Sequence, residues 1–204
     1  MIAVAGGKGG CGKTTTTLGL ARAAARAGDR ALAVDADAGM PDLHRVAGVD
    51  REPTLGDGPP GAVAQPHPDC PAVAVVPAPR DRLARSSVLA RCRGTRPTVL
   101  VDAPAGAGPD AAAPLRAADA TVLVTTLEPA CLRDAARTAA MSRALDTPVV
   151  GAVVSRAGRA PDGVKALLET GVLGCVPYAD DGVSKSQASG ALDAIYREVN
   201  GRRR

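Results

Sequence analysis

Glycines and lysines at the amino terminus form a pattern that can hold a phosphate group. A short apolar run precedes the sequence G-G-K-G-G-C-G-K-T-T, which begins at Gly6. The spacing Gly7-x-x-x-x-Gly12-Lys13-Thr14 is that of a phosphate-binding loop. In such a loop, glycines let backbone N–H groups turn inward around an anion. Lys13 can then reach the β- and γ-phosphates of a nucleotide, and the Thr14 hydroxyl can bind Mg²⁺.

A second lysine, Lys8, lies inside the same loop. The chain has 25 basic residues, and the two loop lysines are joined by only Lys165 and Lys185 elsewhere. Where arginine is the usual cation, a lysine points to a geometric demand. An ammonium is a compact point charge that fits among phosphate oxygens better than a planar guanidinium does.

The loop resembles the deviant Walker A motif, K-G-G-x-x-K-[ST], of the MinD/ParA family of P-loop ATPases. The resemblance implies that the chain binds ATP and Mg²⁺, and that Lys8 reaches across a homodimer interface to the partner's nucleotide. It makes Lys8 and Lys13 catalytic residues that stabilise charge on the phosphates. The nucleotide-binding residues implied for the loop are Gly7, Lys8, Gly9, Gly10, Cys11, Gly12, Lys13, Thr14 and Thr15.

Acidic residues follow two apolar runs further along the chain. Asp35-Ala-Asp37 comes after one run, and Asp102 ends another in the sequence T-V-L-V-D-A-P-A-G. Acids at the carboxyl ends of parallel strands lie where an open α/β sheet keeps its ligand site. The resemblance implies that Asp37 orients the attacking water. It also implies that Asp35 acts on Mg²⁺ through water and that Asp102 binds Mg²⁺ together with Thr14. The alternative is that these acids cap a following turn or helix.

Two later segments fit the base-binding side of the same family. Arg156 follows Ser155 at the end of an apolar run, and Pro177 precedes Tyr178 in a second one. The resemblance implies that Arg156 and Pro177 contact the nucleotide. Relatives carry asparagine where this chain has Ser155. A serine offers the base only one hydroxyl, so we expect weaker recognition of the base and a less secure preference for adenine over guanine.

The apolar periodicity predicts alternating strands and helices. With the resemblance, it indicates a three-layer α/β/α fold of the SIMIBI type, with a mostly parallel sheet of about seven strands. We expect one domain over residues 1–204, with a proline- and glycine-rich loop at about 50–71 and a short basic tail at 201–204. Predicted helices span residues 13–27, 82–92, 131–145 and 191–200, the last docked on the sheet.

Composition restricts the class of protein. There is no Phe or Trp and only two Tyr, which argues against stacking on single-stranded nucleic acid. Five cysteines without a C-x-x-C pair favour a reducing compartment over disulfides or zinc. Cys11 has two readings: a loop thiol of depressed pKa, or a tolerated small residue. Without a signal peptide or a long apolar run, we expect a cytoplasmic protein, peripheral to the membrane at most.

The expected function is a MinD-like switch that dimerises with ATP, hydrolyses it slowly and acts in cell division or intracellular positioning. An activating protein partner would accelerate the reaction, and a membrane surface or non-specific DNA would receive the dimer. The alternatives are a ParA-like partitioning ATPase for DNA, a nucleotide-gated scaffold that barely hydrolyses ATP, and an iron–sulfur carrier. Paired cysteines, which the carrier would need, are absent from the sequence.

Overall fold

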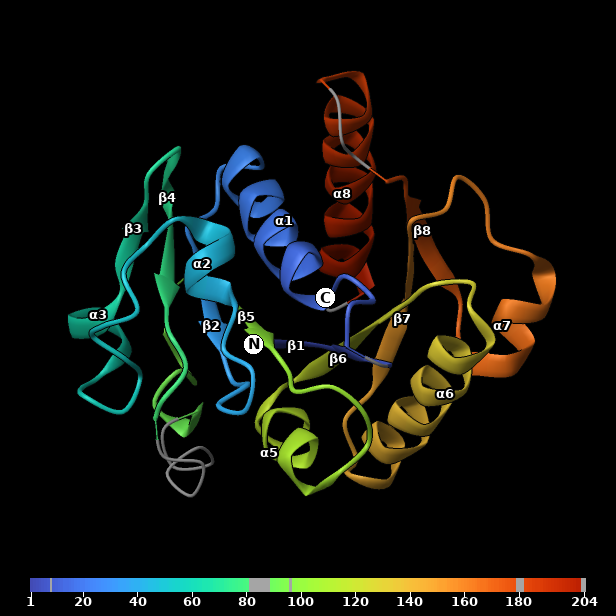
Figure 1. Cartoon of the computed structure of the whole chain (residues 1–204), viewed down its shortest axis with the longest axis horizontal. Coiled ribbons are helices and arrows are strands. Elements are labelled where there is room, and N and C mark those ends of the chain that lie inside the picture. The colour runs from blue at the N-terminus through green and yellow to red at the C-terminus, as the bar shows by residue number, and fades with distance from the viewer. Residues whose placement is uncertain (8, 81–88, 96, 179–181, 203–204) are drawn as a thin grey trace.

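The computed structural model describes residues 1–7, 9–80, 89–95, 97–178 and 182–202. Its described strands form one sheet of eight strands in the order β3-β4-β2-β5-β1-β6-β7-β8 (Figure 1). Neighbouring strands run parallel, except for the antiparallel pair β3 and β4. The strands are β1 Ile2–Gly6, β2 Ala31–Asp35, β3 Gln65–His67, β4 Cys70–Val76, β5 Thr98–Asp102, β6 Ala120–Thr125, β7 Val149–Ser155 and β8 Val172–Val176. The helices are α1 Lys13–Arg26, α2 Leu43–Ala47, α3 Pro60–Val63, α5 Pro109–Ala117, α6 Pro129–Ala144, α7 Asp162–Leu168 and α8 Gly182–Arg202.

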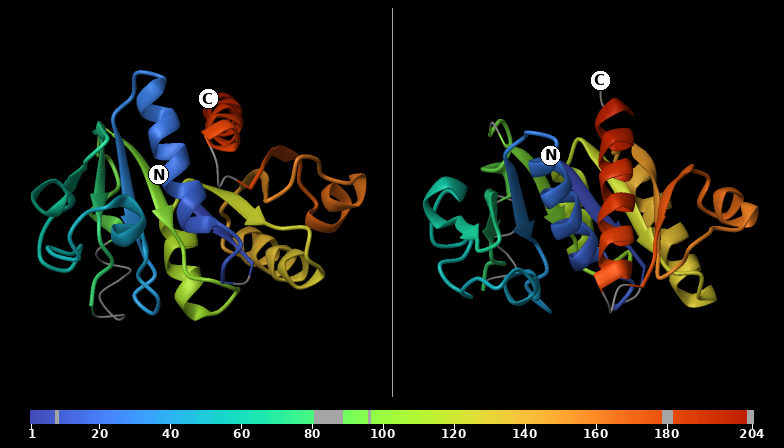
Figure 2. Two further views of the ribbon diagram at one scale, coloured as in Figure 1. Left: turned by 45° about the horizontal axis from the view of Figure 1, so that its top comes forward. Right: turned by 90° about the horizontal axis from the view of Figure 1, so that it is seen from above.

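Helices cover both faces of the sheet, as Figure 2 shows. Side chains alternate along β1: Ile2 and Val4 pack in the core beneath α1 and α8, while Ala3 and Ala5 pack with Leu115 of α5. A strand buried on both faces is expected for a parallel sheet between helical layers. The predicted three-layer α/β/α fold with a mostly parallel sheet is confirmed.

The proline- and glycine-rich segment adds an eighth strand to the seven or so that we predicted. Its strand β3 pairs antiparallel with β4 at the edge of the sheet, where Pro66 can be accommodated although it has no N–H to donate. The only regular helix of this segment is the short α3, as its composition requires. The predicted helix at 82–92 lies mostly outside the described residues.

The carboxyl-terminal helix α8 docks on the sheet beside α1, as expected, and is longer than predicted. Its residues Leu192, Ile195, Tyr196 and Val199 are buried in the core shared with α1. Near its end, Arg202 Nη1 donates a hydrogen bond of 2.6 Å to the carbonyl of Val150 in β7. Among the described helices, none combines the length and the apolarity needed to cross a bilayer.

Candidate functional site

The site lies where β1, β2 and β5 end at the same edge of the sheet. β5 lies between the other two strands, and Asp35 pairs in register with Asp102. β1 runs into the glycine-rich loop, and α1 begins at Lys13 directly after it. The parallel order therefore brings the loop and both acidic elements, which are far apart in sequence, to one place.

A cavity of about 390 Å³ opens between these elements, within the size range of ligand pockets. The predicted site residues that line it are Gly9, Gly10, Lys13, Thr14, Asp37 and Asp102. It is also lined by Met40, Pro41, Asp42, Arg45, Ala103 and Ala105, which we did not predict.

The glycine-rich loop is held from beneath by hydrogen bonds from distant elements. Ser155 Oγ donates to the Cys11 carbonyl at 2.5 Å and lies 3.2 Å from the Thr125 carbonyl. Gly12 has a left-handed φ of 91°, and a Cβ there would lie 3.3 Å from Ser155 Oγ. The Gly106 N–H lies 3.3 Å from the carbonyl oxygens of both Gly6 and Gly7. These contacts tie the described part of the loop to β7 and to the loop that follows β5.

Asp102 has a carboxylate that is buried at the base of the cavity. Thr17 Oγ1 lies 3.5 Å from its Oδ1, and Thr14 lines the same cavity. The pKa of Asp102 is raised to about 7, mainly by burial and then by the neighbouring Asp35 carboxylate, against the lowering effect of Thr14 and Lys13. A buried carboxylate beside a hydroxyl suits Mg²⁺, which would relieve this charge. The described residues form no cluster of three or more His, Cys, Asp or Glu that could hold a metal, so phosphates and water would supply its other ligands.

Asp35 holds the loop that follows it. Its Oδ1 accepts a hydrogen bond of 2.8 Å from the Asp37 N–H, and its Oδ2 accepts bonds of 3.2 Å from the Asp42 and Leu43 N–H groups. Burial raises the pKa of Asp35 to about 6, although these N–H groups lower it. Asp35 is not among the described residues that line the cavity. Turn capping, the alternative reading, is therefore observed, and a water-mediated role with Mg²⁺ stays a prediction.

Asp37 both caps a turn and faces the cavity. Its Oδ1 accepts hydrogen bonds of 3.0 Å from the N–H groups of Gly39 and Met40. Its Oδ2 makes no hydrogen bond to another described residue, and the side chain lines the cavity. One carboxylate oxygen thus fixes the side chain while the other is available to a ligand or water. The role of orienting the attacking water stays a prediction.

The thiol of Cys11 lies beneath the loop. Its Sγ donates to the Val124 carbonyl in β6 at 3.6 Å. Burial raises the pKa of Cys11, and the attraction of Lys13 is a smaller effect in the opposite direction. The reading of a thiol with depressed pKa was therefore wrong, because desolvation outweighs the nearby positive charge. Only the backbone of Cys11 remains a candidate for nucleotide binding.

A second cavity, of about 250 Å³, lies on the other side of the loop. It is lined by Gly12, Thr15, Thr16, Ser155, Arg156, Val176, Pro177, Tyr178, Ala188 and Leu192. The predicted base-side residues Arg156 and Pro177 are thus brought together with the loop. Ser155 differs from the expectation, because its hydroxyl is bonded to the loop carbonyl and acts as a tie for the loop.

Two further predicted residues of the loop are Gly7 and Lys8. Gly7 is buried and lines neither cavity, and Lys8 lies outside the described residues.

The unpredicted pair Asp42 and Arg45 lies at the main cavity, where Arg45 Nε and Nη2 donate to the two Asp42 oxygens at 2.7 and 3.0 Å. Their i,i+3 spacing just after the Asp35-x-Asp37 element was the available signal.

Comparison with known proteins places the chain in a family. The model of the CobQ/CobB/MinD/ParA nucleotide binding domain matches residues 2–192. An uncharacterized ATP-binding protein of Methanocaldococcus jannaschii is 32% identical over 213 residues, which cover 93% of this chain and 78% of that protein. The cell division ATPase MinD of Pyrococcus furiosus has a TM-score of 0.86 at 25% identity over 98% of both chains. MinD of Pyrococcus horikoshii, complexed with Mg-ADP, has a TM-score of 0.85 at 24% identity and covers 100% of this chain and 98% of that one. The chain therefore belongs to the CobQ/CobB/MinD/ParA nucleotide-binding family, which confirms the resemblance to MinD/ParA ATPases found in its sequence.

Proposed function

We propose that this protein is a MinD-like molecular switch that binds ATP with Mg²⁺, dimerises in the ATP state and hydrolyses ATP slowly. The main support is one cavity in which Lys13, Thr14, Asp37 and Asp102 lie together beside the glycine-rich loop. A cation, a hydroxyl and two carboxylates in this arrangement suit a triphosphate and its divalent ion better than any neutral ligand.

Each group has a distinct part in the proposed reaction. Backbone N–H groups of the loop and the Lys13 ammonium bind the phosphates. Mg²⁺ held by Thr14 and Asp102 would neutralise charge on the phosphate oxygens. Asp37 orients a water for in-line attack on the γ-phosphate. Lys8 of a second copy adds positive charge, as an arginine finger does in other P-loop enzymes.

The switch would act through the two loops beside the phosphates. Asp35 holds the backbone of the loop that carries Asp37, and it lies beside Asp102. The loop after β5 is joined to the phosphate-binding loop through the Gly106 N–H. Loss of the γ-phosphate would remove the group that both loops surround, so the two copies would separate. A protein partner that orders these loops would accelerate turnover.

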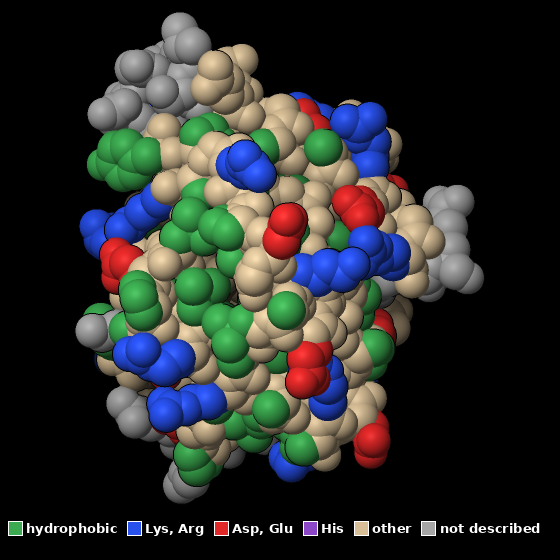
Figure 3. Space-filling model, turned by 90° about the vertical axis from the view of Figure 1, so that its right-hand side faces the viewer, with side chains coloured by type: hydrophobic (Ala, Val, Ile, Leu, Met, Phe, Trp, Pro, Cys, Tyr) green, Lys and Arg blue, Asp and Glu red, His purple; other side chains and the backbone are tan. Residues whose placement is uncertain are grey.

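We place the protein in the cytoplasm, where the ATP-state dimer would act on a membrane surface in cell division or positioning. On the face carrying α6 and α7, Figure 3 shows Lys and Arg scattered among Asp and Glu. DNA binding through backbone phosphates needs such cations gathered together, so this face gives the DNA-partitioning alternative no support.

Light scattering after size-exclusion chromatography, run with and without Mg-ATP, tests the dimer. We expect the wild-type protein to form dimers with ATP and Lys8→Ala to stay monomeric. Asp37→Ala should hydrolyse ATP about 100-fold more slowly or worse and therefore accumulate as a dimer. Lys165→Ala, an exposed lysine on α7, is the matched control and should behave like the wild type.

Two results together would contradict the proposal. The first is that wild-type protein and Asp37→Ala both remain monomeric at saturating Mg-ATP. The second is that phosphate release by Lys8→Ala and Asp37→Ala equals that of the wild type.

A further inference from the structure

The second cavity has few side chains that can distinguish one purine from another. Adenine presents an amino group at position 6, whereas guanine presents a carbonyl there. A carboxamide or a carboxylate reads such a difference well, because its oxygen and nitrogen atoms match a defined pattern of donors and acceptors. Neither group occurs among the described residues that line this cavity, whose polar side chains are four hydroxyls and one guanidinium.

The hydroxyl best placed to read a base is already bonded to the protein. Ser155 is 6% exposed, and its Oγ lies 2.5 Å from the Cys11 carbonyl and 3.2 Å from the Thr125 carbonyl. A serine has a single hydroxyl proton, so these carbonyls leave none for a nucleobase. Ser155 is therefore a positioning residue for the phosphate-binding loop, because it acts on the ligand through the Cys11–Gly12 peptide.

Arg156 is the charged group that the cavity offers to a base. Its φ of 57° lies in the left-handed region, which is uncommon for a residue with a side chain and is concentrated at functional sites. The side chain is exposed and lines the cavity, and it makes no hydrogen bond or ion pair to another described residue. A guanidinium only donates, so it can bind the O6 and N7 acceptors of guanine together, whereas adenine offers it N7 alone.

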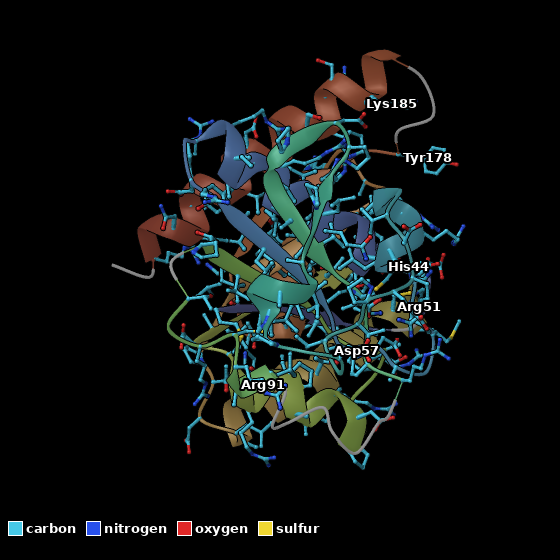
Figure 4. The ribbon with its side chains drawn as sticks, turned by 90° about the vertical axis from the view of Figure 1, so that its left-hand side faces the viewer. His44, Arg51, Asp57, Arg91, Tyr178 and Lys185 are labelled. Atoms are coloured by element: carbon cyan, nitrogen blue, oxygen red, sulfur yellow. The ribbon has the colours of Figure 1, made fainter. Side chains whose placement is uncertain are left out.

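Tyr178 adds a surface that accepts any base. It follows β8, is 64% exposed and lines the same cavity, and Figure 4 shows it at the edge of the molecule on the same side as Lys185 of α8. Every base has a flat face, so stacking on an aromatic ring tolerates sequence and base changes.

We infer that this site takes purine nucleoside triphosphates as a class and binds GTP with a dissociation constant within tenfold of that for ATP. Arg156 contributes to binding of guanine, and Ser155 supports the phosphates of either nucleotide. The inference rests on the proposed function, since it concerns the base of the nucleotide whose phosphates occupy the main cavity.

Fluorescent ATP and GTP analogues, titrated with Mg²⁺ and checked by competition with the unlabelled nucleotides, test it. The quantity of interest is the ratio of the dissociation constants, GTP over ATP, which we expect to be below ten for the wild-type protein. Ser155→Ala should weaken both nucleotides by about 3- to 10-fold with an unchanged ratio, because the lost hydrogen bond is to the loop. Arg156→Ala should raise the ratio by about 3- to 10-fold. Arg159→Ala, an exposed arginine outside the cavity lining, is the control and should leave both constants unchanged.

The outcomes separate this inference from the proposed function. Tight binding of ATP with a wild-type ratio of ten or more overturns the inference alone, whereas failure to bind ATP overturns the proposed function. A change of ratio in Ser155→Ala of more than threefold would show that Ser155 reads the base. The wild-type ratio and Arg156→Ala decide the matter even where Ser155→Ala does not fold.

Discussion

The cysteine side chains differ in accessibility, and Cys11 in the phosphate-binding loop is among the buried ones. Burial raises its pKa, and burial raises that of Cys92 to about 11, so both thiols are poorly ionised near neutral pH. Cys70 is half-buried in β4. We predict that a thiol-alkylating reagent at pH 7.5 modifies Cys70 at least about ten times faster than Cys11. Mass-spectrometric mapping over time measures both rates.

Urea-unfolded protein is the control for this labelling, because its cysteines should react at similar rates. Modification of Cys11 ahead of Cys70 in the native protein would mean that the loop thiol is activated after all. The buried position described above would then be wrong.

The sequence predicted the parts of the site that depend on residue type and local spacing. The spacing from Gly7 to Thr14 is enough to indicate a phosphate-binding loop, and Asp102 ends the apolar run that forms β5. The tie from Ser155 to the Cys11 carbonyl joins residues 144 positions apart, and the Cys11 thiol meets Val124 across 113 positions. Such contacts depend on which strands become neighbours, so local spacing could not reveal them.

At the scale of elements, the contact between β1 and β6 depends on Gly6, because glycine has no side chain. Gly6 has a φ of 152°, and a Cβ there would lie only 2.0 Å from the Val124 carbonyl oxygen. We predict that Gly6→Ala lowers the free energy of unfolding by about 2–4 kcal/mol, because strand backbones must separate to admit the methyl group. Urea denaturation measures the change.

Gly163→Ala provides the matched control for that strand contact. Gly163 lies in α7, and a Cβ there would meet nothing within 4 Å. Its replacement should change stability by less than about 1 kcal/mol. Equal stability of Gly6→Ala and the wild type would show that β1 and β6 are not packed this closely.

The hairpin of β3 and β4 should be sensitive to acid through His67. The ring is 3% exposed, and its Nδ1 accepts a hydrogen bond of 3.1 Å from the Asp69 N–H. Burial, and then the nearby Arg22, lower the pKa of His67 below 6.5, so the unfolded chain binds the proton more readily. Its contribution to stability is therefore present above about pH 6.5 and is lost as the pH falls through the folded-state pKa.

We predict that the wild-type protein loses more unfolding free energy between pH 7.5 and pH 5 than His67→Asn does. Asparagine keeps an acceptor for the Asp69 N–H but cannot be protonated. Chemical denaturation of both proteins at the two pH values gives the comparison, in which all other titrating groups cancel. Parallel losses would exclude His67 as the source.

The extents of two long helices, α1 and α6, followed from their periodicity, while those of α8 and of the short elements did not. The helix predicted at residues 13–27 is α1, and the one predicted at 131–145 is α6 with a start two residues earlier, at a proline. β3 has three residues and a proline, which no alternating pattern could indicate. It exists because β4 offers it an edge to pair with.

At the scale of the whole molecule, nucleotide binding and folding should be linked. A ligand at about 100 times its dissociation constant stabilises the folded state by about 2.7 kcal/mol. For a chain of this size, we predict a rise in melting temperature of roughly 5–11 °C with saturating Mg-ATP. Lys13→Ala, which removes the cation buried at the loop, should abolish the shift, and differential scanning fluorimetry measures both. An equal shift in the variant would mean that ATP is bound elsewhere.

The loop between β1 and α1 is tied at Cys11 to Ser155, and the Gly106 N–H lies close to the carbonyl oxygens of Gly6 and Gly7 where the loop begins. A loop held by such ties needs no slow opening step, so we expect the rate of nucleotide binding to be governed by how often nucleotide and protein collide. Stopped-flow association rates should then rise in proportion to nucleotide concentration, without a plateau. Slow hydrolysis, and not the binding of ATP, would then set how long each cycle lasts.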